Sequence, residues 1–582
     1  MSATIMWFED LRRKDVAAVG GKNSSLGEMV STLDARGVKV PGGFATTSDA
    51  YWQFIEESGL GQVIRDTLAE LESGHIPLAE AGATIRKAFL KKPWPDNLKN
   101  DILAAYKELG RRAGRDNPDV AVRSSATAED LPDASFAGQQ ETYLNVSGEA
   151  EILEACRKCY ASLFTDRAIS YRTTKGFDHL KVALSVGVQM MVRSDIGGSG
   201  VMFSIDTETG FDKVVVINAA WGLGENVVQG AVDPDEFVVF KPLLENKSFA
   251  PIVEKRLGAK KIKMIYAADS FNPVKNVPTS KAERERFVLD DEDILHLARW
   301  AVEIENHYGC PMDMEWAKDG DTGELFIVQA RPETVQSRKS GAVLQSYSIS
   351  GKGEVLTTGL SVGAAAVAGQ VCVIEDVKDI DQFVDGSILV TSTTDPDWVP
   401  IMKKAAGIIT DHGGRTSHAA IVSRELGTPA IVGTGNATHV LHSEQEVTMS
   451  CGEGDEGFVY SGIAEINIED IQLDDIPQTE TKVMFNLANP GAAFRWWRIP
   501  SDGVGLARME FVINNHIKVH PMALIKFDEL KSEAAKAEIE ELTKGYDDKP
   551  SYFVDKLSRG LARIGAAAHP NPVIVRMSDF KT

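Results

Sequence analysis

The run GIITDHGGRTSHAAIVSRELGTPAIVG, residues 407–433, constrains the fold more than any other part of the sequence. Its apolar start predicts a short strand, and Gly413 and Gly414 predict a tight turn directly after that strand. Ser417 then favours the start of a helix, and Gly427 favours its end. This order of strand, glycine turn and helix predicts mixed α/β structure.

His418 falls in the first turn of that predicted helix. The positive end of a helix dipole disfavours an imidazolium, so we expect a neutral, nucleophilic ring at about pH 7. Backbone N–H groups near Gly413 and Gly414, together with Arg415, would stabilise the anion formed when the ring accepts a phosphoryl group. His412 is the competing nucleophile, and a capping or core histidine is the ordinary alternative.

Length and charge limit the function classes. The chain has 582 residues, too many for one hydrophobic core, which suggests about three to five domains. Lys and Arg number 62 against 84 Asp and Glu, which gives a formal net charge of −22. Such a chain is not expected to bind nucleic acid or an anionic membrane, because that binding needs basic surface. The negative net charge does not exclude anionic small molecules as ligands, since local basic groups and backbone N–H groups bind them.

The cysteines and the N-terminus point to a reducing compartment. The 5 cysteines do not form a disulfide framework. Cys156 and Cys159 form a lone CxxC pair in a predicted helix, and with no further ligands nearby we expect a structural role. The N-terminal segment lacks the apolar core of a signal peptide, and no window is apolar enough to span a membrane. The sequence therefore predicts a cytoplasmic protein.

Hydrophobic patterns divide the chain into regions. Helical spacing covers residues 51–74 and 290–309, and β-branched runs between 182 and 240 predict strands. Small residues and short strands predominate from about 351 to 466, which predicts a compact β/α/β swivel module. The predicted organisation is a first domain over 1–335 with a break between two subdomains near 190–200, a linker over 336–350, the swivel domain over 351–470, a linker over 471–485, and the start of a last domain over 486–582.

Two segments of the first region carry basic residues suited to a nucleotide. Lys22 follows a glycine pair and precedes a predicted Ser-capped helix, which together make a cradle for an anion. Arg123 follows a strand-like run and enters a Ser/Thr-rich segment, where its guanidinium could clamp phosphate. The apolar run at 188–192 could line an adenine, with Gln189 and Met191 as contacts. Each segment alone also fits a solvated helix end, a polar loop or plain core.

A predicted hairpin at 311–334 supplies a third set of residues. Glu315 alternates with Asp313 on one strand, and Gln329 alternates with Arg331 on the next, so each pair shares a face. A carboxylate and an amide oxygen suit Mg²⁺, and an arginine beside them suits a triphosphate. An acidic hairpin with ordinary cross-strand pairing is the alternative.

Together these residues resemble the ATP-grasp nucleotide-binding domain of pyruvate phosphate dikinase-like enzymes. The resemblance implies Mg·ATP held between two subdomains. By position, Lys22, Arg123 and Arg331 would contact the phosphates, and Glu315 and Gln329 would hold the Mg²⁺.

The run at 407–433 resembles the phosphohistidine signature of PEP-utilising enzymes, in which the histidine before AAI carries the phosphate. The resemblance implies that His418 is this carrier. Thr416 matches the threonine on which a regulatory kinase and phosphorylase act in dikinases of this type. A phosphate there would crowd the histidine electrostatically, and a plain N-cap is the alternative role.

The end of the chain resembles the PEP/pyruvate-binding (β/α)₈ barrel of the same family. Arg508 and Arg576 each follow a predicted strand and would hold phosphate and carboxylate, with ordinary surface arginines as the alternative. Residues 483–582 are far fewer than the roughly 250 of a complete barrel. We therefore expect them to be poorly ordered or to form a partial barrel, and the sequence leaves open whether the chain is a fragment.

The order of these domains implies a dikinase reaction. ATP, pyruvate and water would give AMP, phosphoenolpyruvate and phosphate through a phosphohistidine at His418. ATP and pyruvate are the expected substrates, Mg²⁺ is the expected cofactor, and a homodimer is a compatible assembly. An antibiotic phosphotransferase of rifampin type and a carrier fragment that phosphorylates itself without turnover are the alternative functions.

Overall fold

The computed structural model describes residues 3–127, 130–131, 134–135, 141–267, 273–333, 343–415, 417–473, 476–477, 479–487 and 489–578. The chain has mixed α/β structure and divides into two compact units. Unit 1 comprises Met1–Gly197, Ile265–Asn276 and Met314–Arg331, and unit 2 comprises Gly198–Met264, Val277–Asp313 and Pro332–Thr582. The region predicted as one domain over 1–335 therefore contributes to both units.

Unit 1 is built on a five-stranded sheet of order β1-β2-β7-β3-β6. The strands pair antiparallel throughout, and the central strand β7 is almost wholly buried, as its apolar sequence predicts. The strands are β1 (Ile5–Trp7), β2 (Gly43–Thr46), β3 (Val120–Ala126), β6 (Thr142–Val146) and β7 (Leu184–Met190). β4 (Asp130–Leu131) and β5 (Ala134–Ser135) form a separate short pair.

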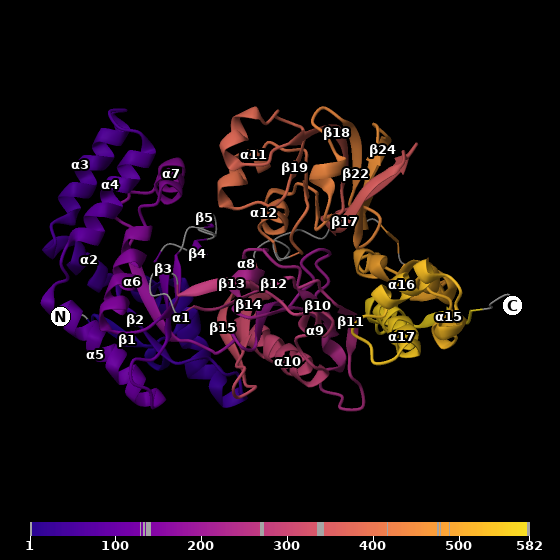
Figure 1. Cartoon of the computed structure of the whole chain (residues 1–582), viewed down its shortest axis with the longest axis horizontal. Helices are drawn as coiled ribbons and strands as arrows, with labels where there is room; N and C mark the ends of the chain where they lie inside the picture. Colours follow the sequence, from indigo (N-terminus) through magenta and orange to yellow (C-terminus); the bar gives the residue numbers. More distant parts are fainter. Residues whose placement is uncertain are drawn as a thin grey trace. The chain divides into compact units, whose positions relative to one another are not determined.

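Helices surround this sheet, drawn in indigo and purple in Figure 1. The helix expected over 51–74 is two helices, because Gly59 takes a left-handed conformation with φ 68° and ends the first. The helices of unit 1 are α1 (Val16–Leu33), α2 (Ser48–Glu57), α3 (Leu60–Glu72), α4 (Leu78–Lys91), α5 (Asp96–Ala113), α6 (Glu149–Ser162) and α7 (Asp166–Lys175).

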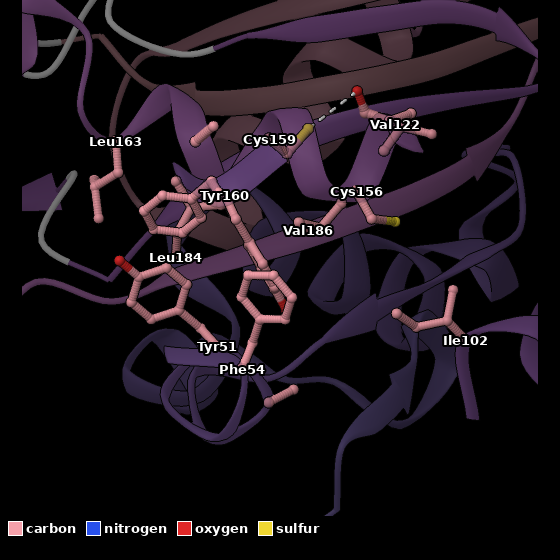
Figure 2. Packing of buried hydrophobic residues seen from close by; sticks show 14 of the residues in the cluster. Tyr51, Phe54, Ile102, Val122, Cys156, Cys159, Tyr160, Leu163, Leu184 and Val186 are labelled. Atoms are coloured by element: carbon pink, nitrogen blue, oxygen red, sulfur yellow. Dashed lines mark hydrogen bonds between the residues drawn. The ribbon is translucent and has the colours of Figure 1, made fainter. Parts of the chain in front are cut away.

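The core of unit 1 contains both cysteines of the CxxC pair. Figure 2 shows Cys156 and Cys159 on α6 among apolar side chains from the helices and the sheet. Burial raises the pKa of Cys156 to about 12 and raises that of Cys159 well above its ordinary value. The Cys159 thiol lies 3.8 Å from the Val122 carbonyl oxygen, and both cysteines are free. These surroundings agree with the structural role that the sequence predicted.

The predicted hairpin is present as β14 (Met312–Lys318) and β15 (Leu325–Pro332). Along β14, buried Met312 and Met314 alternate with the partly exposed Asp313 and Glu315. The alternation puts the two carboxylates on the same face, as expected.

The first part of unit 2 carries an antiparallel sheet of order β11-β10-β9-β8. The helix predicted over 290–309 is α10 (Asp291–Tyr308), which Asp290 caps and Gly309 ends. The strands are β8 (Gly198–Phe203), β9 (Val214–Trp221), β10 (Asp235–Phe240) and β11 (Ile252–Arg256), and the short helices are α8 (Glu225–Val228) and α9 (Lys281–Arg284). β12 (Ile262–Tyr266) and β13 (Val274–Pro278) form a further two-stranded sheet.

The region predicted as a β/α/β swivel module contains a closed barrel of order β17-β21-β20-β19-β18-β22-β23. β18, β19, β20 and β21 are parallel neighbours, and α12 follows β20. Figure 1 labels β18, β19 and α12 of this region. The strands are β17 (Val355–Val362), β18 (Ala366–Val373), β19 (Ile388–Thr391), β20 (Gly407–Thr410), β21 (Ala430–Val432), β22 (Glu446–Ser450) and β23 (Glu456–Ser461). The helices are α11 (Val399–Met402), α12 (His418–Leu426) and α13 (Ala437–Val440).

The two predicted linkers contain regular structure. β16 (Val343–Ser350) falls in the first, and β24 (Glu465–Gln472) reaches into the second. The strands pair antiparallel along their whole length, from Val343–Gln472 to Ser350–Glu465. The sequence analysis did not predict a strand at 343–350, because the partner strand that orders it lies far along the chain. The linker assignment stays a prediction.

The last region holds a three-stranded parallel sheet of order β25-β26-β27. Within the described residues these strands do not close into a barrel, and the interpretation of this region as the start of a (β/α)₈ barrel stays a prediction. The strands are β25 (Phe485–Leu487), β26 (Val504–Arg508) and β27 (Val573–Arg576), and the helices are α14 (Met509–Val512), α15 (Pro521–Ile525), α16 (Glu533–Leu542) and α17 (Lys549–Ala568).

No helix within the described ranges combines the length and the apolar character that crossing a membrane requires.

Candidate active site

His418 is the first residue of α12, as the sequence predicts. Ser417 caps this helix, because its Oγ accepts a hydrogen bond from the Ala420 N–H at 3.3 Å. Gly427 ends the helix and has φ 72°. Gly413, in the turn that precedes the helix, has φ 110°. The predicted strand, glycine turn and capped helix are therefore confirmed.

A threonine that the sequence analysis did not single out orients the histidine ring. Thr394 Oγ1 lies 2.9 Å from Nδ1 of His418, and the ring is partly exposed. Thr394 itself is buried, so its hydroxyl has little freedom to move. A signal was available, because Thr394 closely follows β19 and β19 is a parallel neighbour of β20, which places their carboxyl ends together. The competing His412 is exposed and precedes the turn.

Arg415 lies beside carboxylates in the structure. Its guanidinium is 3.3 Å from Glu236 and 2.9 Å from Asp455. Burial lowers the pKa of Arg415, but the charges of Asp455 and Glu236 outweigh it and raise that pKa above its ordinary value. The predicted role of Arg415 beside a phosphoryl group is not seen in this arrangement and stays a prediction. Thr416 lies outside the described residues.

The predicted phosphate lysine lies at a break in α1. Gly20 has φ 74° and ψ 168° inside this helix, so a second helical stretch begins just before Lys22. The helix therefore starts at the glycine pair, and the serines expected to cap it lie inside it. A Cβ added at Gly20 would lie 2.3 Å from Ser125 Oγ on β3, so only glycine allows this close approach.

Strand β15 connects this part of α1 to Arg123. Arg123 Nη1 donates to the Val328 carbonyl at 3.1 Å, and Ser25 Oγ donates to the Ala330 carbonyl at 2.7 Å. Arg123 Nε is buried and has no hydrogen-bond partner within the described ranges. A buried guanidinium N–H without an acceptor is costly, which is consistent with a site completed by an anion.

The two predicted metal ligands are in contact across the hairpin. Gln329 Nε2 donates to Glu315 Oε1 at 3.2 Å, and Arg331 is exposed two positions further along β15. The described residues contain no cluster of three or more His, Cys, Asp or Glu side chains suited to a metal. A carboxylate and an amide oxygen fit Mg²⁺ when phosphate and water supply its other oxygen ligands.

The predicted adenine strand is β7. Gln189 is buried and its Nε2 lies 3.5 Å from the Pro41 carbonyl oxygen, at the limit of a hydrogen bond. The backbone N–H of Met191 donates to Asp119 at 3.0 Å, just beyond the end of β7. The structure thus gathers the predicted lysine, arginines, glutamate and glutamine of the first region in unit 1.

Arg508 and Arg576 are the last residues of the parallel neighbours β26 and β27, and they are register partners. Arg576 Nη2 lies 2.5 Å from Glu510 Oε1, and the guanidinium of Arg508 lies 5.8 Å from the centre of the Phe511 ring. The two arginines are therefore brought together at the carboxyl edge of the sheet, where the sequence predicted them.

Comparison with known proteins agrees with this division of residues. Residues 16–349 match the family model "Pyruvate phosphate dikinase, AMP/ATP-binding domain", and residues 383–454 match "PEP-utilising enzyme, mobile domain". A phosphoenolpyruvate synthase of Synechocystis sp. is 57% identical over 593 residues, covering 100% of this chain and 72% of that protein. The chain belongs to the phosphoenolpyruvate synthase family.

Other members of the phosphoenolpyruvate synthase family show similar likeness. The enzyme of Escherichia coli is 51% identical over 584 residues, covering 100% of this chain and 73% of its own. The phosphoenolpyruvate synthase of Helicobacter pylori is 51% identical over 592 residues, which cover 99% of this chain and 73% of that protein. The mobile-domain match contains His418 and Thr394, and the ATP-binding match contains Lys22, Arg123 and the β14–β15 hairpin.

Proposed function

We propose that this chain catalyses the phosphoenolpyruvate synthase reaction, in which ATP, pyruvate and water give AMP, phosphoenolpyruvate and phosphate. The observation that carries the proposal is the position of His418. Its ring lies at the N-terminal end of a capped helix, with Nδ1 against the Thr394 hydroxyl and a glycine turn beside it. This is the arrangement that a phosphoryl carrier needs.

The nucleotide is assigned to an ATP-grasp site in the 16–349 region. Lys22, Arg123 and Arg331 are proposed to bind the phosphates, and the unpartnered Nε of Arg123 supports that role. Glu315 and Gln329 are proposed to hold Mg²⁺, which when bound would neutralise phosphate charge. Gln189 and Met191 are proposed to border the adenine.

His418 is proposed to attack the β-phosphorus of ATP with the lone pair of Nε2. The new N–P bond replaces the bond from the β-phosphorus to the oxygen that bridges it to the α-phosphorus, and AMP leaves with that oxygen. The ring then carries a pyrophosphoryl group. Water attacks the γ-phosphorus, the bond from that phosphorus to the bridging oxygen breaks, and inorganic phosphate leaves while the β-phosphoryl group stays on His418. Because Thr394 engages Nδ1, the ring is oriented to react through the other nitrogen.

Transfer of the phosphoryl group from His418 to pyruvate is assigned to the last region of the chain, which is proposed to be the start of a (β/α)₈ barrel. Pyruvate would lose a methyl proton to solvent, and the oxygen of the resulting enolate would attack the phosphorus of the phosphohistidine. The N–P bond would then break to regenerate the neutral ring. Arg508 and Arg576 are proposed to hold the phosphate and the carboxylate. The swivel domain over 351–470 would carry His418 between the two sites, because both reactions need near-contact geometry.

The decisive experiment uses ATP labelled at the β-phosphorus. Wild-type protein is expected to take up acid-labile label, and His418→Ala is expected to take up none. His412→Ala is the matched control and should be labelled normally, since that ring is exposed and precedes the turn. Label retained by His418→Ala would refute the proposal.

Pyruvate-dependent AMP formation separates this function from its alternatives. Turnover with pyruvate supports the synthase, turnover with rifampin supports the antibiotic phosphotransferase, and one stoichiometric burst supports a self-phosphorylating carrier. The family membership favours the first. A cytoplasmic location, a homodimer and regulation at Thr416 by a kinase and phosphorylase belong to the same proposal.

A further inference from the structure

One arginine lies near each end of the helix that begins at His418, and both are paired with glutamates of the ATP-binding region in unit 2. Arg415 precedes the helix, and its Nη1 lies 3.3 Å from Glu236 Oε1. Arg424 lies in the last turn, and its Nε donates to Glu208 Oε1 at 2.9 Å. The side chains are nearly closed to solvent, with exposed fractions of 13% and 4% in the first pair and 7% and 12% in the second.

The backbone between these glutamates approaches the start of α12 closely. A Cβ added at Gly230, where φ is 68°, would lie 2.3 Å from the Cβ of Ser417 and 2.4 Å from its Cα. A Cβ added at Gly414 would lie 3.3 Å from Pro234 Cδ. Gly230 therefore meets the start of α12 through backbone that tolerates no added side chain, and the Pro234 ring lies close to Gly414 in the turn.

We propose that Glu208 and Glu236 are positioning residues that seat the phosphohistidine helix on the ATP-binding domain for phosphorylation of His418. They act through Arg424 and Arg415, one at each end of the helix. The inference rests on the proposed phosphohistidine function and deepens it, because it names the contacts that define one position of the swivel domain.

Buried ion pairs suit a contact that has to form and break in every cycle. Removing two charges from water costs about as much as their attraction returns, so such pairs add little net affinity. Leaving one partner unpaired is strongly unfavourable, so the pairs impose a single register. Glu208 and Glu236 therefore orient the helix without holding the domain permanently, which a large apolar interface would do.

Arg415 has a second partner that eases its release. Asp455, from the swivel domain itself, lies 2.9 Å from the Arg415 guanidinium. Arg563 on α17 lies 3.1 Å from the same carboxylate. When Arg415 leaves Glu236, Asp455 still balances its charge, so the swivel domain departs without an uncompensated buried cation.

The test measures His418 phosphorylation in single turnover with β-labelled ATP, alongside the affinity for a non-hydrolysable ATP analogue. E208Q and E236Q are each expected to slow phosphorylation about tenfold or more, because a misplaced reacting group loses near-contact geometry. Affinity for the analogue should change less than about twofold, since neither residue is assigned to the nucleotide. A rate loss that is matched by an equal loss of affinity would overturn the proposal.

A matched control is Glu305, whose carboxylate pairs with Lys241 at exposed fractions of 19% and 13% in the same unit. E305Q removes a comparable ion pair away from α12 and should leave the phosphorylation rate unchanged. The charge swap E208R with R424E should recover most of the rate that either single change loses. A swap no faster than its single variants would argue against a direct pair.

Hydrogen exchange tests the same contact without any chemistry. Amides in 413–417 and 230–236 should exchange faster in E208Q and E236Q than in the wild type or E305Q. Unchanged exchange in both variants would overturn the proposed seating. If His418→Ala still takes up label from β-labelled ATP, the proposed function fails. The hydrogen-exchange result then still decides whether the two glutamates seat the helix.

Discussion

The turn and helix start at His418 in unit 2 and the residues of unit 1 that are proposed to bind phosphate are built in opposite ways. The first is one continuous run, in which β20, the glycine turn and α12 follow each other directly. The second joins distant segments, since Arg123 reaches Val328 over 205 positions and Ser25 reaches Ala330 over 305. A local site depends on one or two residues, whereas an assembled site depends on the strand that joins its parts.

The two sites should therefore fail differently. Loss of His418 removes the only group that the proposed chemistry uses as nucleophile, so its effect is complete. Loss of one phosphate contact leaves the others in place, so its effect is large but partial.

The largest graded effect is expected for Arg123→Ala. Removing one preorganised donor to a reacting phosphate typically costs about 10²–10³-fold in rate, so phosphorylation of His418 by ATP should slow to that extent. Arg86→Ala is the control, because Arg86 pairs with Asp166 on the helical side of unit 1. Equal rates in the two variants would mean that Arg123 does not contact phosphate.

Gly20→Ala should destabilise unit 1 by about 3 kcal/mol, because strain at positive φ adds to a clash with β3. Gly37→Ala also falls at positive φ, 84°, but in the milder left-handed helical region with ψ 7°, and nothing lies within 4 Å of the added Cβ. It should cost only about 1 kcal/mol. Urea unfolding of the two variants measures the difference, and equal losses would show that the approach of α1 to β3 is looser than the structure indicates.

Thr394→Val should slow phosphorylation of His418 about tenfold, since the ring loses the hydroxyl that orients it. Thr394→Ser keeps the hydroxyl and should recover most of the rate. The measurement is the single-turnover labelling rate at saturating ATP. If Thr394→Val phosphorylates His418 as fast as Thr394→Ser does, then Thr394 contributes packing alone.

The last prediction concerns the acid stability of unit 1, away from both proposed sites. Burial, with the charge of Arg172, lowers the pKa of His179 to about 4. The unfolded chain therefore binds this proton at a higher pH, so the stability present above about pH 6.5 falls as the pH drops towards 4. His179→Asn should flatten that slope, which is at most about 1.4 kcal/mol per pH unit. Urea midpoints measured across this range check the prediction, and an unchanged slope would contradict it.

The sequence predicted the local features well and the distant partners poorly. The α12 start, its end at Gly427 and the alternation of β14 follow from caps and spacing that act within a few residues. The single helix expected over 51–74 failed because the left-handed Gly59 interrupts it. The strand at 343–350 was missed because β24, which pairs with it, lies more than one hundred positions away.

The sequence by itself determined the local structure around the proposed nucleophile, because His418, its capped helix and the glycine turn are contiguous. It also determined which residue types could bind phosphate and metal. Only the tertiary structure decided that Thr394 faces His418, that Arg123 meets β15, and that Arg415 and Arg424 pair with Glu236 and Glu208. These contacts join side chains far apart in the chain, and a short-range pattern carries no information about which of many similar carboxylates or hydroxyls folding will bring into reach.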